Sequence, residues 1–123
     1  MAYIERHQVT VTTGTATGTG YTPVVNGFVL AIVYTKTDYA AGVDFTVTGE
    51  TSGIIIWDQD NVDATVTVYP RGATCDTAGL ASLYAGSGEP VEDRIPVAQE
   101  RIKIAIAAGG NGKTGVFDVY VGA

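Results

Sequence analysis

Short stretches in which apolar and polar residues alternate constrain the fold of this 123-residue chain more than any other feature. Side chains along a β-strand point alternately to opposite faces of the sheet, so a period of two predicts strands buried on one face. The alternating stretches are residues 8–13, 45–48, 64–69, 102–106 and 116–121. Two further stretches also favour strands because they are almost wholly apolar or β-branched: residues 28–37 and 54–57.

The ends of these stretches predict how the strands connect. Residues 28–37 carry so few polar groups that we expect a central strand buried on both faces. The glycine-rich run 109–112 is a strong turn signal, so the last two stretches should form a hairpin. Residues 13–20 contain mainly Gly, Thr and Ala, which favours a flexible hairpin tip.

Seven or eight short strands separated by turns predict an all-β fold. We expect residues 1–123 to form a single domain, a β-sandwich or jelly roll of antiparallel strands with one long irregular loop. Residues 1–7 should form an irregular N-terminal arm. The inward positions should include Phe28, Leu30, Ile32, Ile55, Ile104, Ile106, Phe117 and Val119.

The long loop is residues 71–94, where no strand pattern occurs. Asp76-Thr77 are suited to cap a single helical turn over Leu80, Leu83 and Tyr84, ended by Gly86. Such long connections are uncommon in compact domains and often bind ligands. The apolar residues in this loop leave two interpretations open: a lid folded back on the sheets, or a binding loop.

Charged residues make up only 16% of the chain, and the mean hydropathy is +0.18. This composition indicates that partner subunits cover part of the surface, although Thr and Gly are an alternative source of polarity. The net charge of −6 and the scattered basic residues argue against nucleic-acid binding.

The cysteine content and the absence of long apolar segments in the sequence indicate the cellular compartment. Cys75 is the only cysteine, so an intrachain disulfide is excluded. The first residues lack the apolar region of a signal peptide, and no apolar run has the roughly 20 residues of a membrane helix. We expect a protein that is made in a cytoplasm and stays there or is assembled from there, without membrane contact.

The residues that could carry chemistry favour structural roles. His7 is expected at the surface of the N-terminal arm, and Cys75 is expected to be a small buried or half-buried filler. Residues 107–114 end in Gly-Lys-Thr like a phosphate-binding loop, but a strand follows where that loop needs a helix. Nucleotide binding and enzymatic activity are therefore not expected.

Acidic residues gather in two places. Asp58, Asp60 and Asp63 lie between two strands and could hold calcium, yet the spacing of an EF-hand is missing and Asp-rich turns are common. Glu89, Glu92, Asp93 and Glu100 are expected to form a solvated acidic edge. No metal or other cofactor is predicted.

Three segments carry a resemblance. They are Tyr3-Ile4-Glu5-Arg6-His7-Gln8, Val25-Asn26-Gly27-Phe28-Val29-Leu30-Ala31-Ile32 and Gly88-Glu89-Pro90-Val91-Glu92-Asp93-Arg94-Ile95-Pro96-Val97. Together they make the chain resemble small virion accessory proteins of tailed bacteriophages. The resemblance implies a structural virion protein, foremost a capsid decoration or cement protein bound to the major capsid protein or other virion proteins. It also implies self-association, with a trimer as the first expectation.

Two other roles compete. A neck, tail or fibre component is an equivalent virion role, and a carbohydrate- or receptor-binding β-sandwich would use Trp57 and the tyrosines as a stacking platform. Trp57 ends an apolar strand, which favours core packing instead. For the virion role, we expect the contacts to come from the N-terminal arm and the long loop. The candidate interface residues are Tyr3, Ile4, Leu80, Leu83, Tyr84 and Val91.

Overall fold

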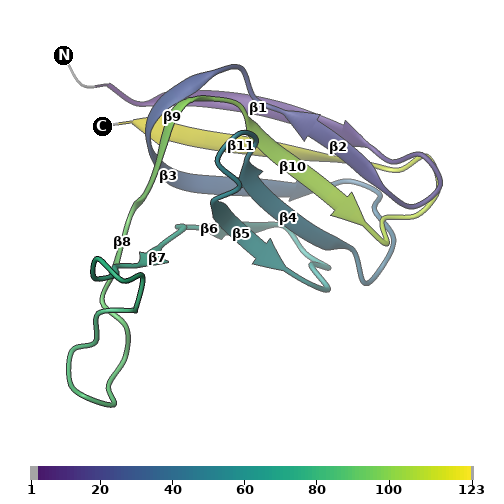
Figure 1. Cartoon of the computed structure of the whole chain (residues 1–123). Coiled ribbons are helices and arrows are strands. Elements are labelled where there is room, and N and C mark those ends of the chain that lie inside the picture. Colours follow the sequence, from purple (N-terminus) through teal and green to yellow (C-terminus); the bar gives the residue numbers. More distant parts are fainter. Residues whose placement is uncertain (1–2, 123) are drawn as a thin grey trace.

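The chain folds entirely as β-structure. The computed structural model describes residues 3–122, in which there is no helix and 56% of the residues are in strands. The strands form antiparallel sheets, one of them curled as a half-barrel (Figure 1). The predicted all-β class is therefore confirmed. Within this part of the chain, no helix is long and apolar enough to cross a membrane.

The first sheet has five strands. Its order is β1-β11-β3-β6, and β9 pairs with the beginning of β3. The strands are β1 (Glu5–Thr12), β11 (Thr114–Gly122), β3 (Val25–Lys36), β6 (Val66–Val68) and β9 (Ile95–Glu100). The predicted central position of residues 28–37 is confirmed, because β3 has neighbours on both sides. Their predicted burial on both faces is wrong, because the outward side chains of Ala31 and Val33 are partly exposed and that of Thr35 is exposed.

The second sheet has four strands, in the order β2-β10-β4-β5. They are β2 (Gly18–Tyr21), β10 (Ile102–Ala107), β4 (Asp44–Gly49) and β5 (Ile55–Gln59). Two short strands, β7 (Gly72–Ala73) and β8 (Glu92–Asp93), pair at the base of the long loop. Each of the seven stretches predicted from sequence contains a strand, and the described residues hold four more: β2, β7, β8 and β9.

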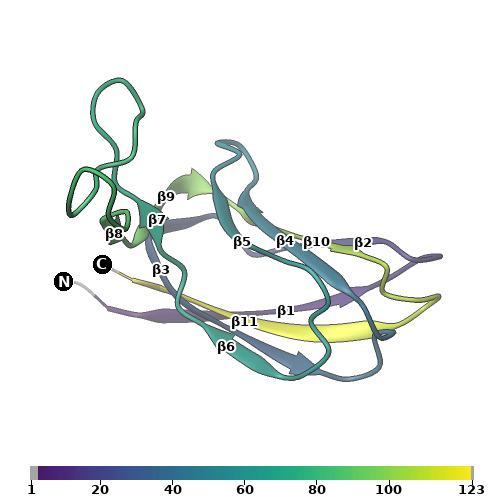
Figure 2. The same ribbon diagram turned by 90° about the horizontal axis from the view of Figure 1, so that it is seen from below.

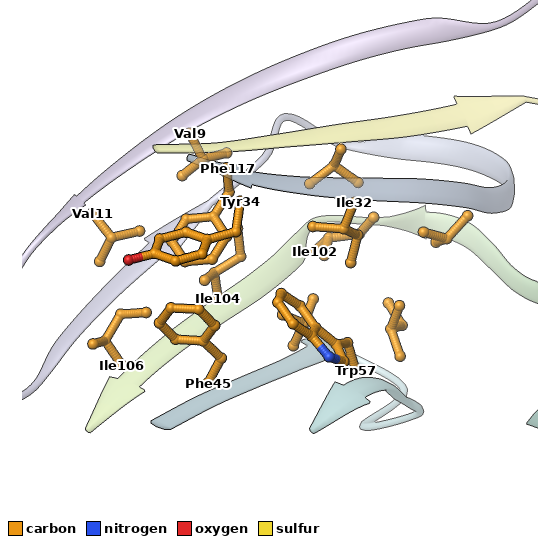
Figure 3. Close-up of a cluster of buried hydrophobic side chains, with 14 of the residues drawn as sticks. Val9, Val11, Ile32, Tyr34, Phe45, Trp57, Ile102, Ile104, Ile106 and Phe117 are labelled. Atoms are coloured by element: carbon orange, nitrogen blue, oxygen red, sulfur yellow. The ribbon is translucent and has the colours of Figure 1, made fainter. Parts of the chain in front are cut away.

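The core lies between the inner faces of the two sheets (Figure 3). Phe45 on β4 is its centre, since its ring lies 4.6 Å from Tyr34, 5.0 Å from Phe117 and 5.5 Å from Trp57, measured between centroids. Most of these contacts are edge-to-face, the arrangement that the quadrupoles of aromatic rings favour. Tyr34 and Phe117 belong to the first sheet, so Phe45 connects the two sheets.

Five of the eight predicted core residues are buried, and three are not. The buried ones are Ile32, Ile104, Ile106, Phe117 and Val119. Ile55 is 60% exposed because the register of β4 and β5 shifts by one residue, which turns both Ile56 and Trp57 inward. A shift between β3 and β11 likewise turns Val29 inward and leaves Phe28 and Leu30 partly exposed. β-Bulges change which side chains face the core, and alternation alone does not locate them.

The last two strands do not form the predicted hairpin. β10 pairs with β2 and β4 in the second sheet, whereas β11 pairs with β1 and β3 in the first. The segment between them crosses from one sheet to the other, with positive φ angles at Ala108, Gly110 and Gly112. The glycine-rich run is therefore a turn, as predicted, but a turn between sheets.

Residues 13–20 are not the unpaired tip that their composition suggested. Thr13 is buried, and its Oγ1 accepts a hydrogen bond from the Lys113 amide at 2.9 Å, which ties this turn to the crossing segment. The last residues of this range, together with Tyr21, form β2, which pairs with β10. A Cβ at Gly20 would lie 2.6 Å from Val11 and 2.9 Å from Val9, so glycine lets β2 pack closely over β1.

The expectation of an irregular N-terminal arm over residues 1–7 is wrong for its second half. β1 begins at Glu5, and its pairing with β11 continues from there without a break. Met1 and Ala2 lie outside the described residues. Tyr3 and Ile4 precede the strand, and their side chains are exposed.

Candidate protein-binding loop

The long loop, residues 71–94, extends away from the two sheets (Figures 1 and 2). It leaves the body through β7 and returns through β8, and two isolated antiparallel bridges, Cys75 with Ala81 and Leu83 with Pro90, close smaller turns within it. The amide of Val91 donates to the carbonyl of Ser82 at 2.8 Å. The segments of the loop therefore hold one another in place. Of the two interpretations left open by the sequence, the lid folded back on the sheets is not observed (Figure 2).

Near its first bend, the long loop contains a tight turn where a helical turn was predicted. The Oδ1 atom of Asp76 accepts hydrogen bonds from the amides of Ala78 at 2.8 Å and Leu80 at 3.0 Å. Gly79 has a φ of +80°, a conformation that glycine adopts without a Cβ penalty. Asp76 thus caps backbone donors as expected, but the chain reverses instead of continuing as a helix.

The long loop exposes large apolar side chains. Leu80 is 67% exposed, Tyr84 is 76% exposed and Leu83 is 41% exposed, while Val91 is partly buried. Each fully buried side chain of this size would gain about 1.5–3 kcal/mol by leaving water. The loop therefore has apolar surface that a partner protein would stabilise by covering it.

The other two candidate interface residues lie at the same end of the molecule. Tyr3 is 65% exposed and Ile4 is 63% exposed. In both views, the two termini lie at the end from which the long loop extends (Figures 1 and 2). The fold therefore gathers all six predicted interface residues at one end, in two separate groups.

The long loop also carries a net negative charge. Between Gly72 and Asp93 it holds Asp76, Glu89, Glu92 and Asp93 and no lysine or arginine. Basic residues occur only where it joins the body, at Arg71 and Arg94, and the Arg94 guanidinium lies 4.9 Å from the centre of the Phe28 ring. A partner surface for this loop is expected to be apolar with positive charge nearby.

His7 and Cys75 are not where the sequence suggested. Cys75 is exposed on the long loop, because the chain there is too far from the core to use a small filler. His7 is partly buried in β1, on the face that carries Val9 and Val11, and its Nε2 atom has no hydrogen-bond partner among the described residues. The two side chains are on different parts of the molecule and do not form a pair.

The segment between β5 and β6 is held by aspartate hydrogen bonds. Asp63 Oδ1 accepts a hydrogen bond from the Gly42 amide at 2.7 Å, and Asp44 Oδ1 at the start of β4 accepts one from the Asn61 amide at 3.0 Å. Asp58 and Asp60 are exposed. In residues 3–122, no group of three or more His, Cys, Asp and Glu side chains is arranged to hold a metal ion.

The segment that resembles a phosphate-binding loop connects two sheets. Residues 107–114 run from the end of β10 to the start of β11, and a strand follows them as the sequence predicted, although it begins at Thr114, two residues earlier than expected. The amides of Gly109 and Gly112 donate to the carbonyls of Ala16 and Gly14, both at 2.9 Å. Two of the amides that would face a phosphate are therefore already used within the fold.

Glu100 is buried, although its sequence context suggested a solvated edge. It is 6% exposed, and its Oε1 accepts hydrogen bonds from the amides of Ser52 at 2.9 Å and Thr51 at 3.0 Å. These bonds, that from Ser52 most strongly, lower the pKa of Glu100 from its ordinary value of 4.5, against the opposing effect of burial. No sequence pattern marked this residue, because its partners are 48 and 49 residues away.

The Glu100 carboxylate gives a prediction about acid stability. A carboxyl group whose pKa is lower in the folded state stabilises the fold when ionised, and this contribution is lost as the pH falls through the folded-state pKa. We expect Glu100→Gln to lower the Tm at pH 7. The difference from the unsubstituted protein should shrink below about pH 4 because protonated Glu and Gln then act alike. Thermal melts across this pH range test it; a Tm difference independent of pH would contradict it.

The aromatic core contains two buried phenols. Burial raises the pKa of Tyr34, and the negative charges of Asp38 and Asp63 raise it further. Burial likewise raises the pKa of Tyr39, whose Oη donates to the Val11 carbonyl at 2.6 Å. Tyr34 Oη has no hydrogen-bond partner among the described residues. Both side chains therefore remain neutral at physiological pH and act as part of the core.

No protein-family model, curated protein or solved structure matches this chain.

Proposed function

We propose that this protein is a structural component of a tailed-phage virion, foremost a capsid decoration or cement protein that stabilises the head through protein–protein contacts. The observation that carries the proposal is the long loop, which holds Leu80, Leu83 and Tyr84 exposed on a hydrogen-bonded support. A cement protein needs such a projecting apolar element to bind across joints between neighbouring subunits. Many modest contacts repeated over a shell then add up through multivalency.

The arrangement of the three segments that carry the resemblance supports this role. Residues 25–32 lie in β3, and residues 88–97 include the return of the long loop and the start of β9, which pairs with β3 through Val29 and Ile95. Residues 3–8 run into β1, next to β11, which pairs with β3 in turn. Three segments that are far apart in sequence thus form the end of the molecule that bears the exposed apolar groups.

For the fold, the proposal is a β-sandwich of the kind expected from the strand pattern. Two observations support it: the strands are divided into two antiparallel sheets, and Phe45 of one sheet packs on Phe117 of the other. A rigid two-layered body suits a structural role because it fixes the direction in which the long loop extends.

Binding to phage heads tests the role of the long loop. We expect Leu80→Ala and Tyr84→Ala each to weaken binding of the purified protein to heads that lack it by roughly tenfold or more, because exposed anchors of this kind dominate interface energies. The matched control is Ile55→Ala, which removes a similarly exposed aliphatic side chain from β5. Co-sedimentation with heads measures the effect, and circular dichroism should be unchanged in all three variants. Equal binding by the loop variants and the control would contradict the proposal.

The alternative roles make different predictions for the same protein. A neck, tail or fibre component would be present in few copies and would bind no mature heads. A carbohydrate- or receptor-binding module would need an exposed aromatic platform, but Trp57 is packed on Phe45 and buried, and its Nε1 donates to Gln59 at 3.0 Å. The remaining candidates for such a platform are exposed tyrosines, among them Tyr69 and Tyr84. Signal on a glycan array that is lost in Tyr84→Ala would favour this alternative.

A further inference from the structure

The outer face of the first sheet carries a group of apolar side chains on β11 and β3. Val9, Phe117 and Ile32 point into the core, so the residues next to them in β1, β11 and β3 point outward. In register across the three strands, these outward rows are Arg6–Tyr120–Ala31, Gln8–Asp118–Val33 and Thr10–Val116–Thr35. The side chains from β11 and the two apolar ones from β3 are partly exposed.

This apolar surface continues to the end of the molecule where the termini lie. A Cβ at Gly122 would meet Ile4 at 3.0 Å and Leu30 at 3.1 Å, so these two side chains converge over the glycine. Gly122 pairs with Phe28, and Arg94 lies over the Phe28 ring. We call the surface formed by Ile4, Phe28, Leu30, Ala31, Val33 and Tyr120 the apolar face.

The outer face of the second sheet also carries apolar groups, but they lie apart. Its register places Tyr21 beside Lys103, Lys103 beside Thr48, and Thr48 beside Ile55. Ile55 is 60% exposed and Tyr21 is 39% exposed, and the two are separated by Lys103 and Thr48. On the first sheet, Tyr120 and Ala31 are direct neighbours, and a continuous apolar surface of this kind is a candidate for contact with another protein.

We propose that the apolar face binds the long loop of a second copy of this chain. The inference rests on the proposed function, in which the long loop is the binding element, and it names one partner of that loop. The charges are complementary: the loop carries four carboxylates, and the face carries Arg6 on its first row and Arg94 over Phe28. The face also carries one carboxylate, Asp118, which accepts a hydrogen bond from Gln8 at 3.2 Å. The two arginines outnumber it, so the formal net charge of the face is positive.

The direction of the long loop allows this contact only between copies. Figure 2 shows the long loop extending toward the side of the second sheet, away from the outer face of the first sheet, so it does not cover this face in its own copy. A loop that binds a different surface of the next copy forms a head-to-tail contact, which closes into a ring when the rotation permits. A two-fold dimer with a reciprocal exchange of loops also satisfies this contact, and a trimer is the smallest ring without such an exchange. The trimer agrees with the oligomer expected from sequence.

Two classes of variant distinguish the contribution of the long loop from that of the apolar face. Tyr84→Glu changes the long loop, and Ala31→Glu places a negative charge in the middle of the apolar face, where it should repel the acidic loop. Tyr120→Ala is a second face variant that adds no charge. Thr48→Glu is the matched control, because Thr48 is a partly exposed position on the outer face of the second sheet. Circular dichroism and Tm identify any variant that has lost its fold.

The decisive experiment mixes the two classes. In sedimentation at tens of micromolar, the unsubstituted protein and Thr48→Glu should form a closed oligomer, and each loop or face variant alone should associate at least about tenfold more weakly. A mixture of Tyr84→Glu and Ala31→Glu retains one intact loop and one intact face, so it should form a one-to-one dimer and nothing larger. A symmetric loop-to-loop or face-to-face contact would give no complex in this mixture.

The inference is overturned if the unsubstituted protein is monomeric, if the mixture gives no dimer, or if Thr48→Glu disrupts assembly as strongly as Ala31→Glu. These failures are distinct from failure of the proposed function. If the protein stays monomeric while Tyr84→Ala still loses binding to heads, the partner of the loop is a capsid protein and the virion role stands. If oligomers form as predicted and heads are not bound, the self-association stands and the virion role is wrong.

Discussion

Phe45→Ala is expected to destabilise the protein by about 3–5 kcal/mol, the largest effect of any single substitution considered. Phe45 is fully buried, and its ring touches Tyr34, Tyr39, Trp57 and Phe117. Truncation to alanine removes apolar contacts from both sheets and leaves a cavity that rigid aromatic neighbours fill poorly. For a domain of this size, we expect the Tm to fall by more than about 10 °C.

Ile55→Ala is the control for this prediction. Ile55 is 10 residues from Phe45 in the sequence, and its apolar strand predicted a place in the core, but its side chain is exposed. We expect it to change the free energy of unfolding by no more than about 0.5 kcal/mol. Chemical denaturation of both variants makes the comparison. Similar losses for both would mean that the inward and outward faces of β4 and β5 are assigned incorrectly.

Gly115→Ala is expected to cost roughly 2–4 kcal/mol, although it adds a single methyl group. A Cβ at this position would overlap the ring of Tyr39, which packs flat against the glycine at the start of β11. The ring has little room to move because Tyr39 is buried and its Oη donates to the Val11 carbonyl at 2.6 Å. Relief of the overlap therefore requires a shift of the strand or loss of a buried hydrogen bond.

Gly86→Ala provides the matched substitution in open space. A Cβ at Gly86 would have no heavy atom within 4 Å, and the residue is not among those with a positive φ. Its effect on the free energy of unfolding should stay within about 0.5 kcal/mol. If Gly115→Ala melts at the temperature of the unsubstituted protein, the close packing of Tyr39 on β11 is wrong.

Period-two alternation was sufficient to predict most strands but not their partners. Five strands have one face in the core, which produces an alternation of apolar and polar residues in the sequence: β1, β4, β6, β10 and β11. No comparable pattern indicates which sheet a strand joins. β10 and β11 are adjacent in sequence and joined by a strong turn signal, yet they pair in different sheets because Thr13 and its neighbours bind the connecting segment.

The features that sequence reasoning missed depend on contacts between distant residues. Bulges turn Ile55, Phe28 and Leu30 outward, and only the paired strand reveals them. β2 was missed because glycine, which is poor in strands by propensity, is required there for close packing on β1. Glu100 looked like part of an acidic surface, and the amides that it binds lie on a turn elsewhere in the chain.

The irregular course of the long loop was predicted, but its shape was not. Apolar residues in a long segment without strand pattern left a lid and a binding loop open, and Leu80, Leu83 and Tyr84 are exposed on it. Its antiparallel support and its direction depend on hydrogen bonds such as that between Val91 and Ser82, which composition does not specify. The apolar face was not anticipated, because outward positions on β3 were attributed to burial of both faces of a central strand.

The most direct test of the virion role is to locate the protein in purified particles of the phage that encodes it. Quantitative mass spectrometry of gradient-purified virions, combined with immunogold labelling, gives both copy number and position. The account predicts many copies per particle, distributed over the outside of the head. Absence of the protein from purified particles would contradict the central claim.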